Sequence, residues 1–174
     1  MQFNTEQLVT VNEAVAMAEE LVSNYYKLSA SQWSGRRFDI KTAADLSPTE
    51  VIDGPFAQVI RYEGRSPQTP LNSESFDFYK VCLQDHTILE TVRHTPELDL
   101  FPFTLYIVTH ELIHIVRFSL FLQNFEASDE ERLAEEKRVH DETHQILCPL
   151  RIEGLASVLR FYARWRDGFD NLKC

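Results

Sequence analysis

Apolar and polar positions alternate with two different periods along the first third of the chain. Residues 11–29 place apolar groups three and four apart with acids between them, which predicts an amphipathic helix. Thr10 followed by Glu13 has the pattern of a capping box at its start. Between residues 33 and 62 the period becomes two: residues 37–41 alternate strictly, and residues 56–62 are rich in strand formers. These segments predict two paired strands.

The remainder of the chain favours helices. Residues 63–74 contain two prolines and several turn formers, which indicates a loop. After this loop, helices are expected at residues 75–94, at 101–124, from Ser128 with Glu131 as a capping box to about Leu147, and from Pro149 to near Gly168. The expected fold class is therefore α+β and mostly helical. One small strand pair, at about residues 36–62, precedes a long C-terminal set of helices.

Length and charge limit the kinds of protein to consider. A chain of 174 residues is long enough for one domain with a proper core, so we expect a single domain over residues 1–174. Its 27 acidic and 17 basic residues give a net charge of -10, which repels phosphate backbones and anionic membrane surfaces. Neither nucleic acid nor a membrane is an expected partner.

The expected compartment is the cytoplasm. The N-terminal residues lack a basic start followed by an apolar segment, so no secretion signal is predicted. Cys82, Cys148 and Cys174 are an odd number without CxxC spacing, which favours a reducing environment over a disulfide framework. The longest apolar run, residues 100–109, is too short to cross a bilayer.

The segment YIVTHELIHIVRF, residues 106–118, places polar side chains in the most apolar part of the chain. A helix turns about 100° per residue, so His110 and His114 lie within about 40° of each other and can point at one atom. Such a pair can bind zinc, and Glu111 beside it can take a proton from water without binding the metal itself. The alternative is a buried helix whose histidines bond to the backbone or to carboxylates.

HELIH at 110–114 resembles the signature of the zincin metallopeptidases, HExxH with small or apolar neighbours. In the gluzincin branch the third zinc ligand is a glutamate on a later helix, often within the phrase EGLA, and residues 153–156 match that phrase. The resemblance covers about residues 100–165. It implies Zn²⁺ held by His110, His114 and Glu153, with Glu111 as general base of a hydrolase that cleaves a peptide or amide bond. The substrate peptide would lie along an edge strand, here residues 56–62.

A second pair of histidines, His140 and His144, lies downstream, with Glu136 one turn before His140. On so charged a helix, a solvated pair without a function is one interpretation. In a catalytic role, one of them would donate a hydrogen bond to the oxyanion, as a histidine or tyrosine does in gluzincins. Glu136, His140 and His144 are also alternatives to Glu153 as the third metal ligand.

His86 and Glu90 form a further pair four residues apart. Together with the two histidine pairs they give three helices that each offer metal ligands, as in helix bundles with dinuclear iron or manganese sites. A redox protein of this kind is the alternative to a hydrolase that acts on a peptide or protein substrate. A metal-stabilised binding domain without catalysis is a third hypothesis. The sequence leaves the substrate and the oligomeric state open.

Overall fold

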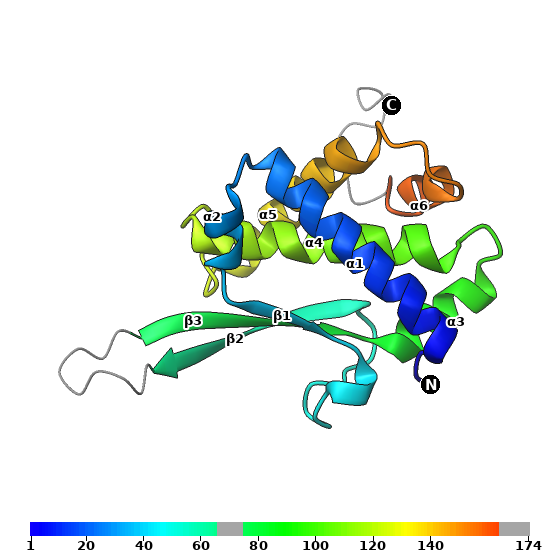
Figure 1. The fold of residues 1–174 in the computed structure, drawn as a ribbon, viewed down its shortest axis with the longest axis horizontal. Coiled ribbons are helices and arrows are strands. Elements are labelled where there is room, and N and C mark those ends of the chain that lie inside the picture. Colours follow the sequence, from blue (N-terminus) through cyan, green and yellow to red (C-terminus); the bar gives the residue numbers. More distant parts are fainter. Residues whose placement is uncertain (66–74, 164–174) are drawn as a thin grey trace.

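The computed structural model describes residues 1–65 and 75–163, in which helices lie on one side of a three-stranded sheet (Figure 1). The elements are α1 (Thr5–Tyr25), α2 (Ala30–Ser34), β1 (Phe38–Lys41), the 3-10 turn η1 (Ala43–Asp45), β2 (Ala57–Arg65), β3 (Ser75–Leu83), α3 (Asp85–His94), α4 (Leu100–Ser119), α5 (Asp129–Leu147) and α6 (Leu155–Phe161). The predicted α+β, mostly helical fold class is confirmed.

Helix α1 begins earlier than the sequence pattern indicated. The Asn4 side chain accepts the Gln7 N–H and the Gln7 side chain accepts the Asn4 N–H, so the capping box lies here. The box predicted at Thr10 and Glu13 is wrong because both residues lie inside the helix. Valines and alanines form the buried face of α1, which packs on α4 and joins it in the hydrophobic core: Val11, Ala14, Ala18 and Val22.

Strand β3 is the centre of the sheet. It runs parallel to β1 and antiparallel to β2, and its Tyr79 is in register with both Phe38 and Arg61. The two strands predicted before residue 63 exist, but their direct pairing is wrong because β3 lies between them. The helix predicted at 75–94 is also wrong in its first half, since only Asp85–His94 is helical.

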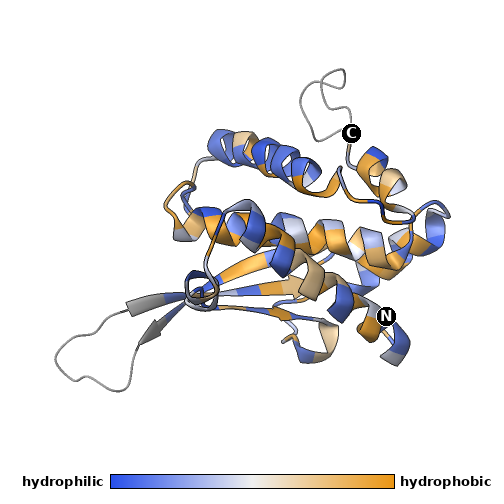
Figure 2. Ribbon diagram, turned by 45° about the horizontal axis from the view of Figure 1, so that its top comes forward, coloured by the Kyte–Doolittle hydropathy of each residue, from blue (hydrophilic) through white to orange (hydrophobic). Residues whose placement is uncertain are grey.

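Helix α4 crosses the middle of the molecule, and α1 and α5 lie against it (Figure 1). Residues Pro102 to Arg117 are all buried except Glu111. Figure 2 shows the contrast between this largely apolar helix and α5, which is largely hydrophilic. Among helices of the described residues, none has both the length and the apolar composition that crossing a membrane requires.

The predicted capping box at Ser128 and Glu131 is confirmed as the start of α5. The last helix begins at Leu155 and not at Pro149; Gly154, just before it, has a φ of 77°. Its predicted end near Gly168 lies outside the described residues, as does most of the loop predicted at 63–74.

The cysteines differ from the expectation. Cys82 is free and buried, whereas Cys148 is disulfide-bonded. An odd number of cysteines still allows two of them to pair. The cysteine count therefore no longer supports a reducing compartment.

Candidate metal centre

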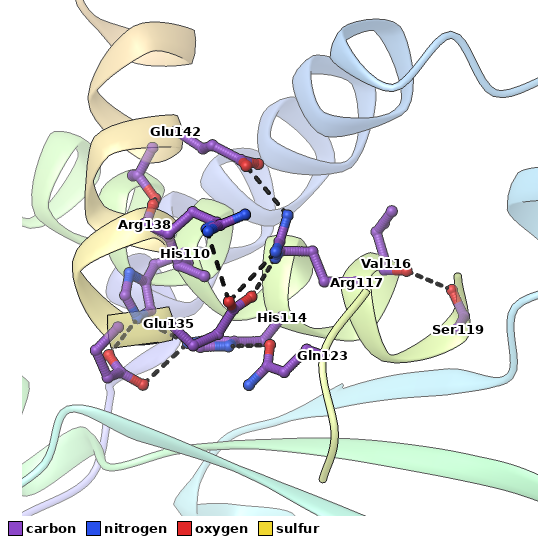
Figure 3. A network of polar contacts seen from close by, with 12 residues as sticks. His110, His114, Val116, Arg117, Ser119, Gln123, Glu135, Arg138 and Glu142 are labelled. Atoms are coloured by element: carbon purple, nitrogen blue, oxygen red, sulfur yellow. Dashed lines mark hydrogen bonds and ion pairs between the residues drawn. The ribbon is translucent and has the colours of Figure 1, made fainter. Parts of the chain in front are cut away.

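His110 and His114 lie on consecutive turns of α4, and their side chains point toward α5 (Figure 3). Their Nε2 atoms are 3.2 Å apart. Glu136 on α5 contacts both: Oε2 is 3.2 Å from Nε2 of His110, and Oε1 is 3.1 Å from Nε2 of His114. The structure thus brings together two imidazoles from one helix and a carboxylate from another.

These distances fit a metal ion. Two ligand atoms that each lie about 2.0–2.1 Å from a tetrahedral zinc ion are about 3.3 Å from each other. The three separations within the cluster are 3.2, 3.2 and 3.1 Å. Imidazole nitrogen and carboxylate oxygen are also usual zinc ligands. His110, His114 and Glu136 could therefore hold zinc with little rearrangement.

Glu136 and His114 each favour the charged form of the other. Burial raises the pKa of Glu136, but its hydrogen bonds with His110 and His114 outweigh that effect and hold the pKa below the usual glutamate range. For His114, burial lowers the pKa, but the Glu136 hydrogen bond and the charges of Glu111 and Glu136 raise it to about 9. An ionised carboxylate is thus held against the buried histidine pair.

Glu111 faces the cavity beside the two histidines. Burial raises its pKa, the charges of His110 and His114 lower it, and Glu136 raises it again, so that the net pKa lies above the ordinary value. A carboxylate with a raised pKa is a better proton acceptor near neutral pH. This position matches the general-base role that the resemblance implies for Glu111.

Gln123, in the loop after α4, was not identified from the sequence. Its Oε1 lies 3.0 Å from Nδ1 of His114 (Figure 3), and because an amide oxygen only accepts, the imidazole is the donor. This hydrogen bond keeps the proton on Nδ1 and directs Nε2 toward Glu136. A loop glutamine gives no sequence signal for such a role, since its contact depends on how the chain turns after α4.

His140 belongs to the same cluster. One ligand atom each from His110, Glu136 and His140 lies within 4.8 Å of the others, and the His110 and His140 rings are 4.3 Å apart between centroids. The Tyr106 hydroxyl lies 2.8 Å from Nδ1 of His140. His144 is buried one turn further along α5 and does not line the cavity, so the structure brings only the first of these two candidate catalytic histidines to the site.

Glu153 does not join the cluster. It is exposed in the turn before α6, and a Cβ on the adjacent Gly154 would meet Oδ2 of Asp99 at 2.5 Å and Cγ of Pro102 at 3.2 Å. This turn therefore lies at the N-terminal end of α4, where Pro102 precedes His110 by about 12 Å along the helix axis. The structure therefore does not bring Glu153 to the two histidines, and the carboxylate that lies beside them is that of Glu136.

His86 and Glu90 are also outside the cluster. Nε2 of His86 lies 3.1 Å from Asp53 Oδ1, in the segment that leads to β2, and neither His86 nor Glu90 lines the cavity. Among the described residues, α3 therefore contributes no side chain to this cluster. The histidine and glutamate side chains that meet there come from α4 and α5.

The cluster opens into a cavity of about 770 Å³ between α4, α5 and β2. Residues 54–59, which include the start of β2, form one wall, and Tyr162 after α6 contributes to another. β2 is an edge strand of the sheet in the described part of the chain. The strand predicted at residues 56–62 therefore lies beside the cavity into which the cluster opens.

The chain matches no protein-family model, no curated protein and no solved structure. What the site does is therefore inferred from its own residues and geometry.

Proposed function

We propose that the protein is a zinc-dependent hydrolase that cleaves a peptide or amide bond, with the ion held by His110, His114 and Glu136. The observation that carries the proposal is the triangle of ligand atoms with sides of 3.1–3.2 Å, open to a cavity that Glu111 also lines. Three protein ligands leave a fourth position of a tetrahedral ion for water or substrate, as in catalytic zinc sites.

Each residue of the site has a role in such a reaction. When bound, zinc would lower the pKa of water toward neutrality and polarise the carbonyl group of the substrate. Glu111 would accept the proton of the attacking water, because its pKa is already raised by burial. His140 would donate a hydrogen bond to the developing oxyanion through Nε2, since its Nδ1 contacts Tyr106.

The substrate would be an extended peptide. The start of β2 lines the cavity, and its outer edge has no partner strand among the described residues, so its backbone groups can pair with a peptide strand. Much of the remaining wall is apolar and aromatic, including Phe56, Phe118 and Phe125. Such a wall would bind apolar side chains of the substrate and limit the access of water.

One observation favours a second candidate. The ligand atom of His140 lies within 4.8 Å of those of His110 and Glu136, so His140 could complete a four-ligand site. A zinc ion with four protein ligands is closed to substrate and acts as a structural element. The protein would then be a metal-stabilised binding domain without catalysis.

The metal itself tests the proposal. Elemental analysis of protein purified without added metal should find about one zinc per chain. Two iron or manganese ions per chain would instead support a dinuclear redox site. Zinc is then titrated into the metal-free wild type, Glu136→Ala and Glu153→Ala, each shown to be folded by circular dichroism. Glu136→Ala should weaken zinc binding by orders of magnitude and Glu153→Ala should leave it unchanged; the reverse ranking would overturn the assigned ligand set.

A further inference from the structure

Arg117 continues the line of polar side chains that the two histidines begin. His110, His114 and Arg117 follow one another at intervals of four and three on α4, so all three face the same neighbouring helix. Arg117 is only 5% exposed. Burial of a guanidinium destabilises the folded state unless carboxylates pair with it. The partners of Arg117 therefore indicate its role in the structure.

Those partners are two glutamates of α5 (Figure 3). Arg117 donates two hydrogen bonds to Glu135, from Nε to Oε1 and from Nη2 to Oε2 at 3.3 Å, so the contact is bidentate. Nη1 of Arg117 donates a hydrogen bond to Glu142 at 3.2 Å. Glu142 also accepts a hydrogen bond from the hydroxyl of Tyr26, the residue that follows α1. One guanidinium therefore connects α4 to α5 at two places.

The two halves of α5 are held by different forces. Its buried residues all lie from Val139 onward, and residues 129–138 contribute none; Leu133, the apolar residue in the middle of this half, is 62% exposed. Apolar packing therefore fixes the C-terminal half of α5 but not the half that carries Glu136. Two glutamates of this first half contact α4, and the side chain of Glu135, at 13% exposed, is more buried than that of Glu136, at 49%.

We infer that Glu135, through Arg117, is the positioning residue that keeps Glu136 at the metal site. Glu135 and Glu136 are consecutive, about 100° apart around the helix, so the orientation that presents one to Arg117 presents the other to His110 and His114. This inference rests on the metal site proposed above. Glu142 makes a similar contact with Arg117, but it lies in the half of α5 that apolar packing already holds.

The test compares Glu135→Ala with Glu142→Ala, a matched control that removes the other carboxylate from the same guanidinium. Zinc is titrated into both metal-free variants and into the wild type, and thermal unfolding is recorded. Glu135→Ala should weaken zinc binding about 10–100-fold, the usual effect of losing a residue that orients a ligand. Glu142→Ala should lower the melting temperature but change the zinc dissociation constant less than about 3-fold, which is below the loss expected for a residue that orients a ligand. A purely structural role of Glu135 would move the melting temperature alone.

The conservative change Glu135→Gln keeps an oxygen that can accept from Arg117 and should restore most of the zinc affinity. If Glu135→Ala does not fold, Glu135→Met and Glu142→Met, which keep the length of the side chain but remove the carboxylate, are compared in the same titration, and equal affinities overturn the inference. Wild-type affinity in folded Glu135→Ala, or equal weakening in both alanine variants, also overturns it while leaving the proposed function intact. Absence of zinc binding by the wild type would overturn the proposed function and this inference together.

Discussion

The hydroxyl of Tyr106 lies 2.8 Å from Nδ1 of His140, in a buried contact between α4 and α5. Tyr106 is one turn before His110 on α4, so the residue that contacts His140 belongs to the same helix face as the proposed metal ligands. The contact involves Nδ1 of His140, and a metal or a substrate would contact the other ring nitrogen, Nε2. These two roles give different outcomes when the imidazole is removed.

His140→Ala should keep zinc and lose activity. If His140 stabilises the oxyanion, the variant should bind zinc within about 10-fold of the wild type and hydrolyse a peptide about 100–1,000-fold more slowly. Zinc titration and steady-state kinetics measure the two effects. His144→Ala is the control, because this residue lies outside the cavity and should preserve both properties in folded protein. Loss of zinc binding in His140→Ala would identify His140 as a fourth ligand.

Glu111→Gln should separate binding from catalysis. The amide cannot accept a proton, so hydrolysis of a substrate found in a peptide-library screen should fall by about 10²–10⁴-fold. Zinc affinity should stay close to that of the wild type, because the proposed ligands are unchanged. Equal rates for the variant and the wild type would leave the site a structural role only.

Gln123→Ala should lower zinc affinity although Gln123 is not a proposed ligand. Without the acceptor for Nδ1, His114 is free to rotate or change tautomer, and zinc affinity should fall about 10–100-fold. Asn124→Ala is the matched control, since Asn124 lines the same cavity but its side chain accepts from Glu126 N. Isothermal titration of zinc into both variants measures the two affinities. Equal zinc affinities would show that the contact between Gln123 and His114 does not orient the imidazole.

The sheet offers a prediction that is independent of the metal. Lys80 donates to both oxygens of Glu50 at 2.7 and 2.8 Å, and Ser47 N and the Tyr62 hydroxyl also donate to this carboxylate. These contacts lower the pKa of Glu50 from 4.5 to about 2. Because the folded-state value is the lower one, the stabilisation is complete above about pH 4.5 and is lost as the pH falls toward 2.

Glu50→Gln should therefore have a lower melting temperature than the wild type at pH 7, and the difference should shrink below pH 4.5 and vanish near pH 2. Thermal unfolding at a series of pH values measures it. A difference that stays constant over this range would mean that the charge of Glu50 does not stabilise the fold.

The sequence was sufficient to place together the two residues of the proposed metal site that are close in the chain. His110 and His114 are brought together by helical spacing alone, and the spacing is visible in the chain. The proposed third ligand is not local: Glu136 and Glu153 were both candidates, and the way α5 packs against α4 brings Glu136 to the two histidines. No periodicity encodes that packing, whereas the phrase EGLA pointed to a residue at the wrong end of α4.

The strand β3 shows a similar limit. Phe78 and Cys82 are four residues apart and fit a helical face, but Tyr79, Val81 and Leu83 alternate along the same segment and fit a strand equally well. Pairing with β1 on one side and β2 on the other selects the strand, because the backbone groups of both neighbours need partners. Partners so distant in the chain are beyond the reach of a local pattern.

Helix α5 has buried residues only from Val139 onward, so its two halves should respond differently to loss of the proposed metal. Exchange of the amide hydrogens of residues 129–138 with solvent should depend on the ion, because the ion would add to the Glu135–Arg117 contact that holds this half, while the amides from Val139 onward should follow global unfolding. Chelation would then speed the exchange of half a helix and leave the hydrophobic core closed, so the ion would order the segment that binds it.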